Sequence, residues 1–439
     1  MGFDGASMTK TKQKKKSALE SAAPRGIGRF FADLGPGLIT GAADDDPSGI
    51  STYSVTGAAF GYAPLWTALF SFPLMAAVQV MCARLGMVTG RGLASNLRRN
   101  YPRSILWGAC ALLVIANVVN IGADLGGMAE ATSMVTGISH VIWTPIYAAL
   151  VVSLLFWTSY RLLAKVFKWL TLVLFAYIIA AFLAHPDWRA VLHSTFVPHI
   201  KWSSIYLAAL VGILGTTISP YLFFWQASQE VEEDRKMGRR TIREREGATN
   251  KELRKSKTDV LTGMLFSNLV MYFIILTTAA TLHAHGKTSI ETAQQAAEAL
   301  KPVAGNGAYL LFTLGLIGTG MLGVPVLAGA AAYAIAEARV WRGTFEDKPP
   351  LAKKFYAVVA VSMLLGLSLN YAGIHAVKML FLAAVLNGIL APPLIVLVVL
   401  LTSSKKVMGH RANSPVLKWL GWAAAAIMAA AAIGMFATM

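Results

Sequence analysis

Residues 42–49 read AADDDPSG, and they lie inside an otherwise apolar run from Leu34 to Phe60. A membrane-spanning helix needs about 20 apolar residues, and three consecutive carboxylates are unexpected in its interior. Pro47 removes a backbone N–H donor and clashes with the preceding helical turn, while Gly49 adds backbone freedom. The stretch therefore predicts a membrane helix that unwinds in its middle.

The composition of the whole chain indicates an integral membrane protein. Of the 439 residues, 56% are hydrophobic and 14% are charged, a more apolar balance than soluble domains have. We predict an all-α fold with about eleven transmembrane helices, since the alternating pattern of a membrane barrel is absent from the sequence. The predicted spans are 35–60, 62–85, 104–132, 143–160, 163–184, 204–229, 258–282, 307–336, 354–373, 376–402 and 416–437.

The basic residues fall on one side of the predicted membrane. With the N-terminus in the cytoplasm, 34 of the 39 Lys and Arg residues lie in cytoplasmic segments, as the positive-inside rule predicts. The formal charge of +17 is thereby explained without nucleic acid as a partner. We expect a multi-pass protein of the cell's inner (plasma) membrane, with its C-terminus outside. The five outward basic residues are Arg189, Lys201, Lys287, Lys301 and Lys378.

A second predicted span, the sixth, is interrupted in the same way by GTTISPY at residues 215–221. Unwound backbone at membrane depth must be buried in protein or line a watery cavity. Breaks five helices apart predict two five-helix halves of inverted topology, 35–184 and 204–402, which is typical of secondary transporters. A pair of proline kinks without a site is the alternative.

The remaining segments complete the expected organisation. Residues 1–34 form a basic cytoplasmic tail, 35–402 the transporter core, and 403–439 an additional C-terminal transmembrane helix. The mixed-charge segment 231–257 is predicted to be a solvated cytoplasmic loop or short helix near anionic lipid. Cys82 and Cys110 lie in or beside apolar segments and indicate neither a disulfide framework nor a thiolate metal site.

The first break carries the candidate ion ligands. Asp44, Asp45 and Asp46 are consecutive, so they cannot all face one direction. Asp46 directly precedes Pro47, where its carboxylate and the freed carbonyl oxygens of residues 43–46, Ala43 among them, can converge. Carboxylates within a membrane are costly and usually functional, and these have no nearby Lys or Arg, so we expect a bound cation. Asp44 and Asp45 contact it through water or cap a half-helix.

The third predicted span supplies a second polar stripe. Asn117, Asn120 and Asp124 are spaced i, i+3 and i+7, which places them on one helical face. We expect that face to point into the bundle. Asn268 and Asn387 are single polar residues in apolar spans, and each either completes an ion's hydration shell or forms a buried hydrogen bond.

The second break offers only oxygen ligands, namely freed carbonyls and the hydroxyls of Thr216, Thr217 and Ser219. Carboxylate, carbonyl, hydroxyl and water ligands suit hard cations, whereas thioether, thiolate and imidazole favour softer metals. The expected cargo is therefore a divalent cation of the magnesium or manganese kind. Because magnesium loses its water reluctantly, a site with few protein ligands can hold it partly hydrated.

At these residues the chain resembles the Nramp family of divalent metal transporters. The similarity runs from GPGLITGAADDDPSG through FGYAPLW to the proline of the sixth span. In that family the first break reads Asp-Pro-Gly-Asn, with Asp and Asn binding the metal, and the sixth helix carries Met-Pro-His. The resemblance implies two inverted five-helix repeats plus extra helices, and it assigns the metal-binding aspartate to Asp46.

The chain also departs from the family pattern. Gly49 stands at the asparagine ligand position, Ser219 at the methionine ligand position and Tyr221 at the histidine associated with proton movement. The family's acidic residue on the third helix corresponds most nearly to Asp124. These departures resemble the Nramp-related magnesium transporters, a divergent branch, and imply a carrier of Mg²⁺ or Mn²⁺ that takes up the ion by alternating access. Proton-coupled uptake of Mn²⁺ or Fe²⁺ is the alternative.

Two further functions remain as rivals. An amine or amino-acid transporter of the same superfamily would also use broken helices. An intramembrane aspartyl protease would pair Asp46 with Asp124 as base and acid, but the sequence has GAD in place of the Gly-x-Gly-Asp signature. We expect a transporter and no enzyme, with the ion and the bilayer as its partners, no cofactor and no obligatory protein partner.

Overall fold

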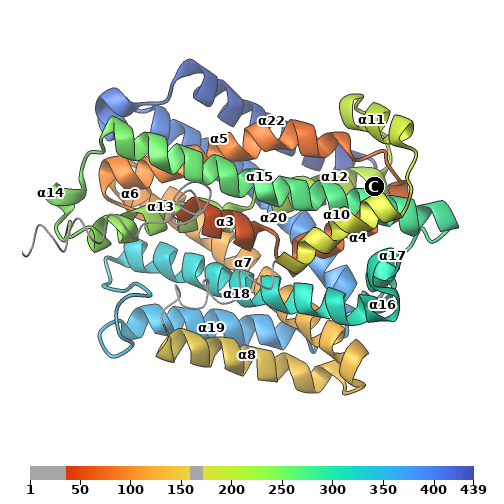
Figure 1. The fold of residues 1–439 in the computed structure, drawn as a ribbon. Helices are drawn as coiled ribbons and strands as arrows, with labels where there is room; N and C mark the ends of the chain where they lie inside the picture. The colour runs from red at the N-terminus through yellow and green to blue at the C-terminus, as the bar shows by residue number, and fades with distance from the viewer. Residues whose placement is uncertain (1–35, 159–171) are drawn as a thin grey trace, which may run out of the picture. The chain divides into compact units, whose positions relative to one another are not determined.

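The structure is a computed structural model that describes residues 36–158 and 172–439, and all regular elements in these ranges are helical. Figure 1 shows long helices packed side by side, with α11, α16 and α17 near one end of the bundle and α14 near the other. The helices of the first half are α3 (Pro36–Asp44), α4 (Pro47–Phe60), α5 (Trp66–Thr89), α6 (Leu93–Asn100), α7 (Arg103–Thr136), α8 (His140–Trp157) and α10 (Ala176–Leu183). Those that follow are α11 (Trp188–Phe196), α12 (Ser204–Thr217), α13 (Pro220–Lys236), α14 (Ile242–Arg245), α15 (Asn250–Thr281), α16 (Ala293–Ala297), α17 (Lys301–Ala304), α18 (Ala308–Arg339), α19 (Lys353–Leu369), α20 (Ala376–Ser403), α21 (Lys405–Met408) and α22 (Pro415–Ala437).

The predicted all-α membrane fold is confirmed. Within the described ranges, eight helical segments are long and apolar enough to cross a membrane. The predicted span 354–373 corresponds to α19, which has 17 residues. Much of the predicted span 163–184 lies outside the described residues, which resume at residue 172 with a short 3₁₀ turn followed by α10. The total of eleven helices therefore stays a prediction.

Both predicted helix breaks are present. Helix α3 ends at Asp44 and α4 begins at Pro47, while α12 ends at Thr217 and α13 begins at Pro220. Each proline occupies the first position of the new helix. At that position the missing N–H has no intrahelical partner to lose, and the fixed φ of proline suits the helix. The two prolines thus start new half-helices instead of kinking a continuous helix.

The half-helices before the breaks pack against their neighbours backbone to backbone. A Cβ added at Gly41 of α3 would lie 2.3 Å from the carbonyl oxygen of Gly263 in α15. A Cβ added at Gly215 of α12 would lie 2.1 Å from the carbonyl oxygen of Ala384 in α20. Small residues that allow such close approach are typical of helix contacts in membranes. Glycine at these two positions therefore fixes where each half-helix lies.

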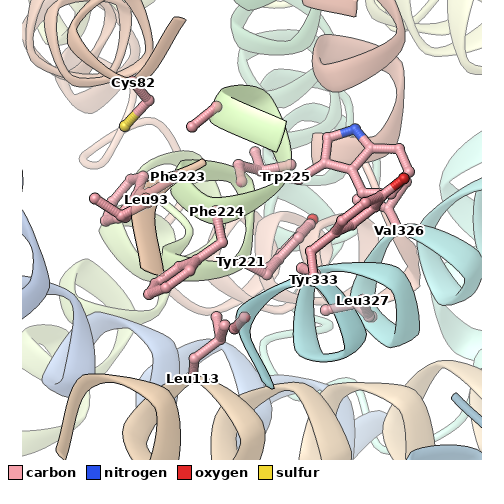
Figure 2. Packing of buried hydrophobic residues seen from close by; sticks show 14 of the residues in the cluster. Cys82, Leu93, Leu113, Tyr221, Phe223, Phe224, Trp225, Val326, Leu327 and Tyr333 are labelled. Atoms are coloured by element: carbon pink, nitrogen blue, oxygen red, sulfur yellow. The ribbon is translucent and has the colours of Figure 1, made fainter. Parts of the chain in front are cut away.

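The half-helix after the second break is anchored by aromatic side chains. Figure 2 shows Tyr221, Phe224 and Trp225 of α13 in a cluster of buried residues that includes Leu327 and Tyr333 of α18. The rings of Trp225 and Tyr333 meet edge to face with centroids 6.1 Å apart, a favoured aromatic arrangement. This packing sets the position of the first turn of α13, where the second break ends.

The prediction of a solvated loop at 231–257 is wrong at both ends. Helix α13 continues to Lys236, and α15 already begins at Asn250, where Thr249 and Glu252 form a capping box. Asp234 is 1% exposed and pairs with Arg239 at 2.6 Å. Buried acidic groups with charged partners and a strong cap extend both helices beyond their apolar segments, which hydropathy alone does not reveal.

Candidate metal site at the helix breaks

Asp46 is the N-cap of α4. Its Oδ1 accepts hydrogen bonds from the Ser48 hydroxyl at 2.6 Å and from the Gly49 N–H at 2.9 Å. The residue is 2% exposed. A carboxylate in this position is stabilised by the unpaired N–H groups of the first helical turn and by the helix dipole. The break therefore fixes the direction in which the Asp46 carboxylate points.

Tyr221 joins the two breaks. Its hydroxyl donates to the freed carbonyl oxygen of Ala43 at 3.0 Å and lies 3.4 Å from Oδ2 of Asp46. The tyrosine sits in the first turn of α13 and is 1% exposed. The sequence marked Tyr221 only as a departure from the Nramp pattern. The structure shows that its hydroxyl orients both oxygen groups of the first break from across the site.

Asp44 and Asp45 point to a different neighbour. The Ser267 hydroxyl of α15 lies 2.7 Å from Oδ2 of Asp44 and 3.1 Å from Oδ1 of Asp45. Oδ1 of Asp44 is buried and has no hydrogen-bond partner in the described part of the chain. The three carboxylates therefore divide into Asp46, which faces Tyr221, and a pair that shares Ser267. Asp46, and neither member of the pair, caps the half-helix.

The polar stripe of α7 is fully buried, as its spacing predicted. Asn117 donates to the carbonyl oxygen of Leu327 at 2.7 Å, and Asn120 donates to Oδ1 of Asn387 at 2.9 Å. Both oxygens of Asp124 lack a hydrogen-bond partner among the described residues. An unpaired buried carboxylate is strongly unfavourable unless a cation or water completes it. Asp124 is thus the least satisfied group of the stripe.

Asn268 has a structural role away from the breaks. Its amide donates to the carbonyl oxygen of Ala68 at 2.6 Å, and its oxygen lies 3.4 Å from the Ser71 hydroxyl. Both partners belong to α5. Of the two alternatives, a buried hydrogen bond between helices is therefore the correct one for Asn268, and Asn387 likewise accepts a buried hydrogen bond.

Gly323 of α18 lies next to Asp46, Ala43 and Asp124. It was not among the residues predicted from the sequence. A Cβ at this position would lie 3.0 Å from Cβ of Asp46 and 3.8 Å from both the Ala43 carbonyl oxygen and Oδ2 of Asp124. One point in space is therefore within 4 Å of all three groups, and glycine leaves that point free. The only sequence signal was a glycine two residues before Pro325 in an apolar span.

The hydroxyls at the second break form hydrogen bonds with carbonyl oxygens of their own helix. Thr216 donates to the carbonyl oxygens of Gly212 and Ile213, at 3.2 and 3.0 Å. Ser219 donates to those of Gly215 and Thr216, at 3.0 and 2.9 Å. These hydroxyls keep free lone pairs, but no hydrogen bond of the described residues links them to Asp46. The structure thus brings Asp46, Ala43 and Asp124 together, and among the described residues no hydrogen bond links Thr216, Ser219 or Asp45 to these three.

The candidate ligand atoms around the first break are all oxygens. Among residues 36–158 and 172–439, no three side chains of His, Cys, Asp or Glu gather closely enough to hold a metal ion. In the same ranges, no Lys or Arg forms an ion pair with Asp44, Asp45, Asp46 or Asp124. The arrangement provides two carboxylates, a freed carbonyl and a hydroxyl, which is the chemistry that hard divalent cations prefer.

Comparisons with known proteins agree with this chemistry. A family model described as natural resistance-associated macrophage protein-like (Nramp) matches residues 37–438. Two relatives are each named divalent metal cation transporter MntH. The one from Klebsiella pneumoniae is 26% identical over 422 residues, covering 94% of this chain and 95% of the relative. The one from Mesorhizobium japonicum is 30% identical over 409 residues, covering 91% and 87%.

A solved structure shares the fold. The manganese transporter of Eremococcus coleocola, in complex with an aromatic bis-isothiourea substituted compound, matches with a TM-score of 0.73 and 20% identity. The match covers 94% of this chain and 89% of that protein. At such low identity the likeness establishes the architecture and leaves the ligand chemistry to be argued from the residues themselves.

Proposed function

The chain belongs to the Nramp family, whose model matches residues 37–438, and from this premise we propose that it carries Mg²⁺ or Mn²⁺ into the cell by alternating access. The family consists of multi-pass membrane transporters of divalent metals, so the protein is a transporter and not an enzyme. The metal is its cargo and not a resident cofactor. The relatives named divalent metal cation transporter support the same cargo class.

The observation that carries the proposal is the pairing of Asp46 with Asp124 across Gly323. Neither oxygen of Asp124 has a hydrogen-bond partner in the described part of the chain, and the space that glycine leaves is within 4 Å of Asp124, Asp46 and the Ala43 carbonyl. A divalent cation in that space would neutralise two buried carboxylates at once. We assign Asp46 as the essential ligand and Asp124 and Ala43 as further ligands.

The other candidate residues take secondary roles in the proposal. Asp45, held by Ser267, contacts the ion through water. Thr216 and Ser219 present hydroxyl oxygens at the second break, and Gly49 leaves room where the Nramp pattern has an amide ligand. Magnesium keeps several waters and binds few protein groups directly, so a site of two carboxylates with glycine on two sides fits a partly hydrated ion.

Proton-coupled uptake of Mn²⁺ or Fe²⁺ is the second candidate. It is favoured by Asp46 and Asp124, which stand at the acidic positions of the Nramp pattern. Against it stands Tyr221, which occupies the histidine position of the family pattern and donates to Ala43 and Asp46. A phenol with such partners does not exchange protons near neutral pH as imidazole does. We therefore place uncoupled movement of the hard ion first.

The proposed topology follows from charge and packing. We place the N-terminus and the α14 end of the bundle in the cytoplasm of a plasma-membrane protein, because most Lys and Arg residues lie there. The α16 end and the C-terminus then lie outside. Two inverted repeats, 35–184 and 204–402, are supported by matching contacts of the half-helices after the breaks. Helix α4 packs on α15 at Gly57, where a Cβ would lie 2.5 Å from the Ile275 carbonyl oxygen, and α13 packs on α5 at Gly86, where a Cβ would lie 2.4 Å from the Ala227 carbonyl oxygen.

Transport by the purified protein tests the proposal. Proteoliposomes that contain a pH dye are given Mn²⁺, with Mg²⁺ as competitor. Competition at comparable concentrations without acidification of the lumen is the expected result. Mn²⁺ uptake that ignores Mg²⁺ and brings protons with it would establish the second candidate. Competition by amino acids or polyamines in place of Mg²⁺ would show an organic cargo and overturn the metal assignment.

A further inference from the structure

A small pocket lies between the candidate metal site and the α16 end of the bundle. It has a volume of about 10 Å³, which is room for about one water molecule. Its polar lining residues are Ser51 of α4 and Glu130 of α7, and Ala293 and Ala296 of α16 cover it. The rest of its wall is apolar or glycine. The pocket is thus closed by a short helix of the connection between α15 and α18.

The pocket lies further along α4 and α7 than the candidate metal site. Ser51 follows Asp46 by five residues in α4, and Glu130 follows Asp124 by six residues in α7. At a rise of 1.5 Å per residue, these intervals correspond to roughly 8–9 Å. Because Ser51 and Glu130 line one pocket, both helices lead from the site in the same direction, towards the face that we place outside.

The Ser51 hydroxyl differs from those of its neighbours in α4, because it has no hydrogen-bond partner in the described part of the chain. Ser51 is 5% exposed and its Oγ makes no hydrogen bond with any described residue. In the same helix, Thr52 donates to the carbonyl oxygen of Ser48 and Ser54 to that of Ile50, each at 2.7 Å. A buried hydroxyl left unpaired costs about 1–3 kcal/mol, so this one indicates a ligand or water that completes it.

Glu130 has a partner that it can exchange. One of its carboxylate oxygens accepts the N–H of Ala293, the first residue of α16, at 2.9 Å. A neutral N–H is a weak partner for a carboxylate compared with a divalent cation. A cation that reaches Glu130 therefore competes directly with the contact that holds α16 over the pocket.

We propose that Glu130 and Ser51 form an entry station for a divalent cation, at which the ion displaces Ala293 from Glu130 and releases α16. This inference rests on the proposed function and deepens it. A carboxylate and a hydroxyl are hard oxygen ligands, the same kind as at the deep site. The closed pocket holds about one water, so a hydrated cation passes only after α16 has moved away. Glu130 thus couples arrival of the ion to opening of the path.

Glu130→Gln in the full-length protein in proteoliposomes tests this, because glutamine still accepts the Ala293 N–H but carries no charge. We expect the KM for Mn²⁺ uptake to rise at least about fivefold with Vmax within about twofold of the unmodified protein. The affinity of the deep site in detergent should not change. Glu291→Gln is the matched control: Glu291 is an exposed carboxylate two residues before Ala293 that does not line the pocket, and its KM should match that of the unmodified protein.

Ser51→Ala gives an independent test, since removal of an unpaired buried hydroxyl should not lower the melting temperature. We expect its KM to rise by about twofold to threefold. Unchanged KM values in Glu130→Gln and Ser51→Ala would overturn the entry station while the proposed function stands. Absence of divalent-cation uptake by the unmodified protein would overturn the proposed function, and the entry station with it.

Discussion

The two helix breaks have the same backbone design and opposite side-chain behaviour. At the first break, the Tyr221 hydroxyl of the other break contacts Asp46 and the Ala43 carbonyl. Asp124 faces the same space and has no hydrogen-bond partner among residues 36–158 and 172–439. At the second, Thr216 and Ser219 donate back to their own helix. A proline break alone therefore does not create an ion site. We place the ion site at the first break because Asp124 has no hydrogen-bond partner among the described residues and Asp46 keeps one oxygen turned towards Tyr221.

Asp124→Asn should have the largest effect of the four tests that follow. Loss of the second carboxylate should lower kcat/KM for Mn²⁺ by at least about 100-fold, equivalent to about 2.7 kcal/mol. The ion-free protein should melt at a higher temperature, because a buried unpaired charge is removed. Uptake assays and thermal unfolding in EDTA measure the two effects. A lower melting temperature with full transport would show that Asp124 is structural.

Gly323→Ala tests the space between the carboxylates. The added methyl group would lie 3.0 Å from Cβ of Asp46 and 3.8 Å from Oδ2 of Asp124, where the proposed ion and its water need room. We expect affinity for Mg²⁺ to fall about tenfold and affinity for Mn²⁺ to fall less, since Mg²⁺ gives up its water more reluctantly.

Gly434→Ala provides the control for that change. It adds the same methyl group in α22, where the new Cβ would make an ordinary contact of 3.5 Å with Leu207. Competition binding of Mg²⁺ against Mn²⁺ separates the two variants. Equal binding constants in both variants would mean that Gly323 does not shape the site.

Gly49→Asn combined with Ser219→Met tests the contribution of the second break. The change restores the amide and thioether of the Nramp pattern and should shift selectivity towards Mn²⁺ by about fivefold to tenfold, since thioether favours softer ions. Competitive uptake of the two ions measures the shift. A folded double variant with unaltered selectivity would refute the argument from ligand type.

Tyr221→Phe should have the smallest effect. It removes the donor to the Ala43 carbonyl and should cost about 1 kcal/mol of stability, with transport lowered by about fivefold or less. Tyr371→Phe, at a tyrosine that is 58% exposed, is the control. If Tyr221→Phe abolishes transport, the hydroxyl takes part in ion movement itself and the two breaks contribute more equally than we infer.

The sequence predicted the parts of the fold that depend on local chemistry. Pro47 and Pro220 marked both breaks, since proline cannot continue the hydrogen-bond ladder of a helix. The charged ends of α13 and α15 were missed because their helical extension depends on burial of Asp234 and its ion pair with Arg239. Hydropathy does not report tertiary contacts of this kind.

Some residues of the candidate site could be predicted from the sequence, and others could not. Asp46 and Asp124 were found because carboxylates in apolar spans are rare. Gly323 and Ser267 were missed, since a glycine or serine in a membrane helix is common and only the fold shows what it faces. Glu130 was missed too, because its role depends on α16, which lies more than 150 residues further along the chain.

Calorimetry of Mn²⁺ binding to purified Asp46→Asn, beside the unmodified protein, tests whether the first break holds the ion. Asparagine still accepts the Gly49 N–H as an N-cap, so the half-helix keeps its start while the charge is lost. We predict binding at least about 100-fold weaker with an unaltered melting transition. Binding equal to that of the unmodified protein would contradict the assignment of the first break as the ion site.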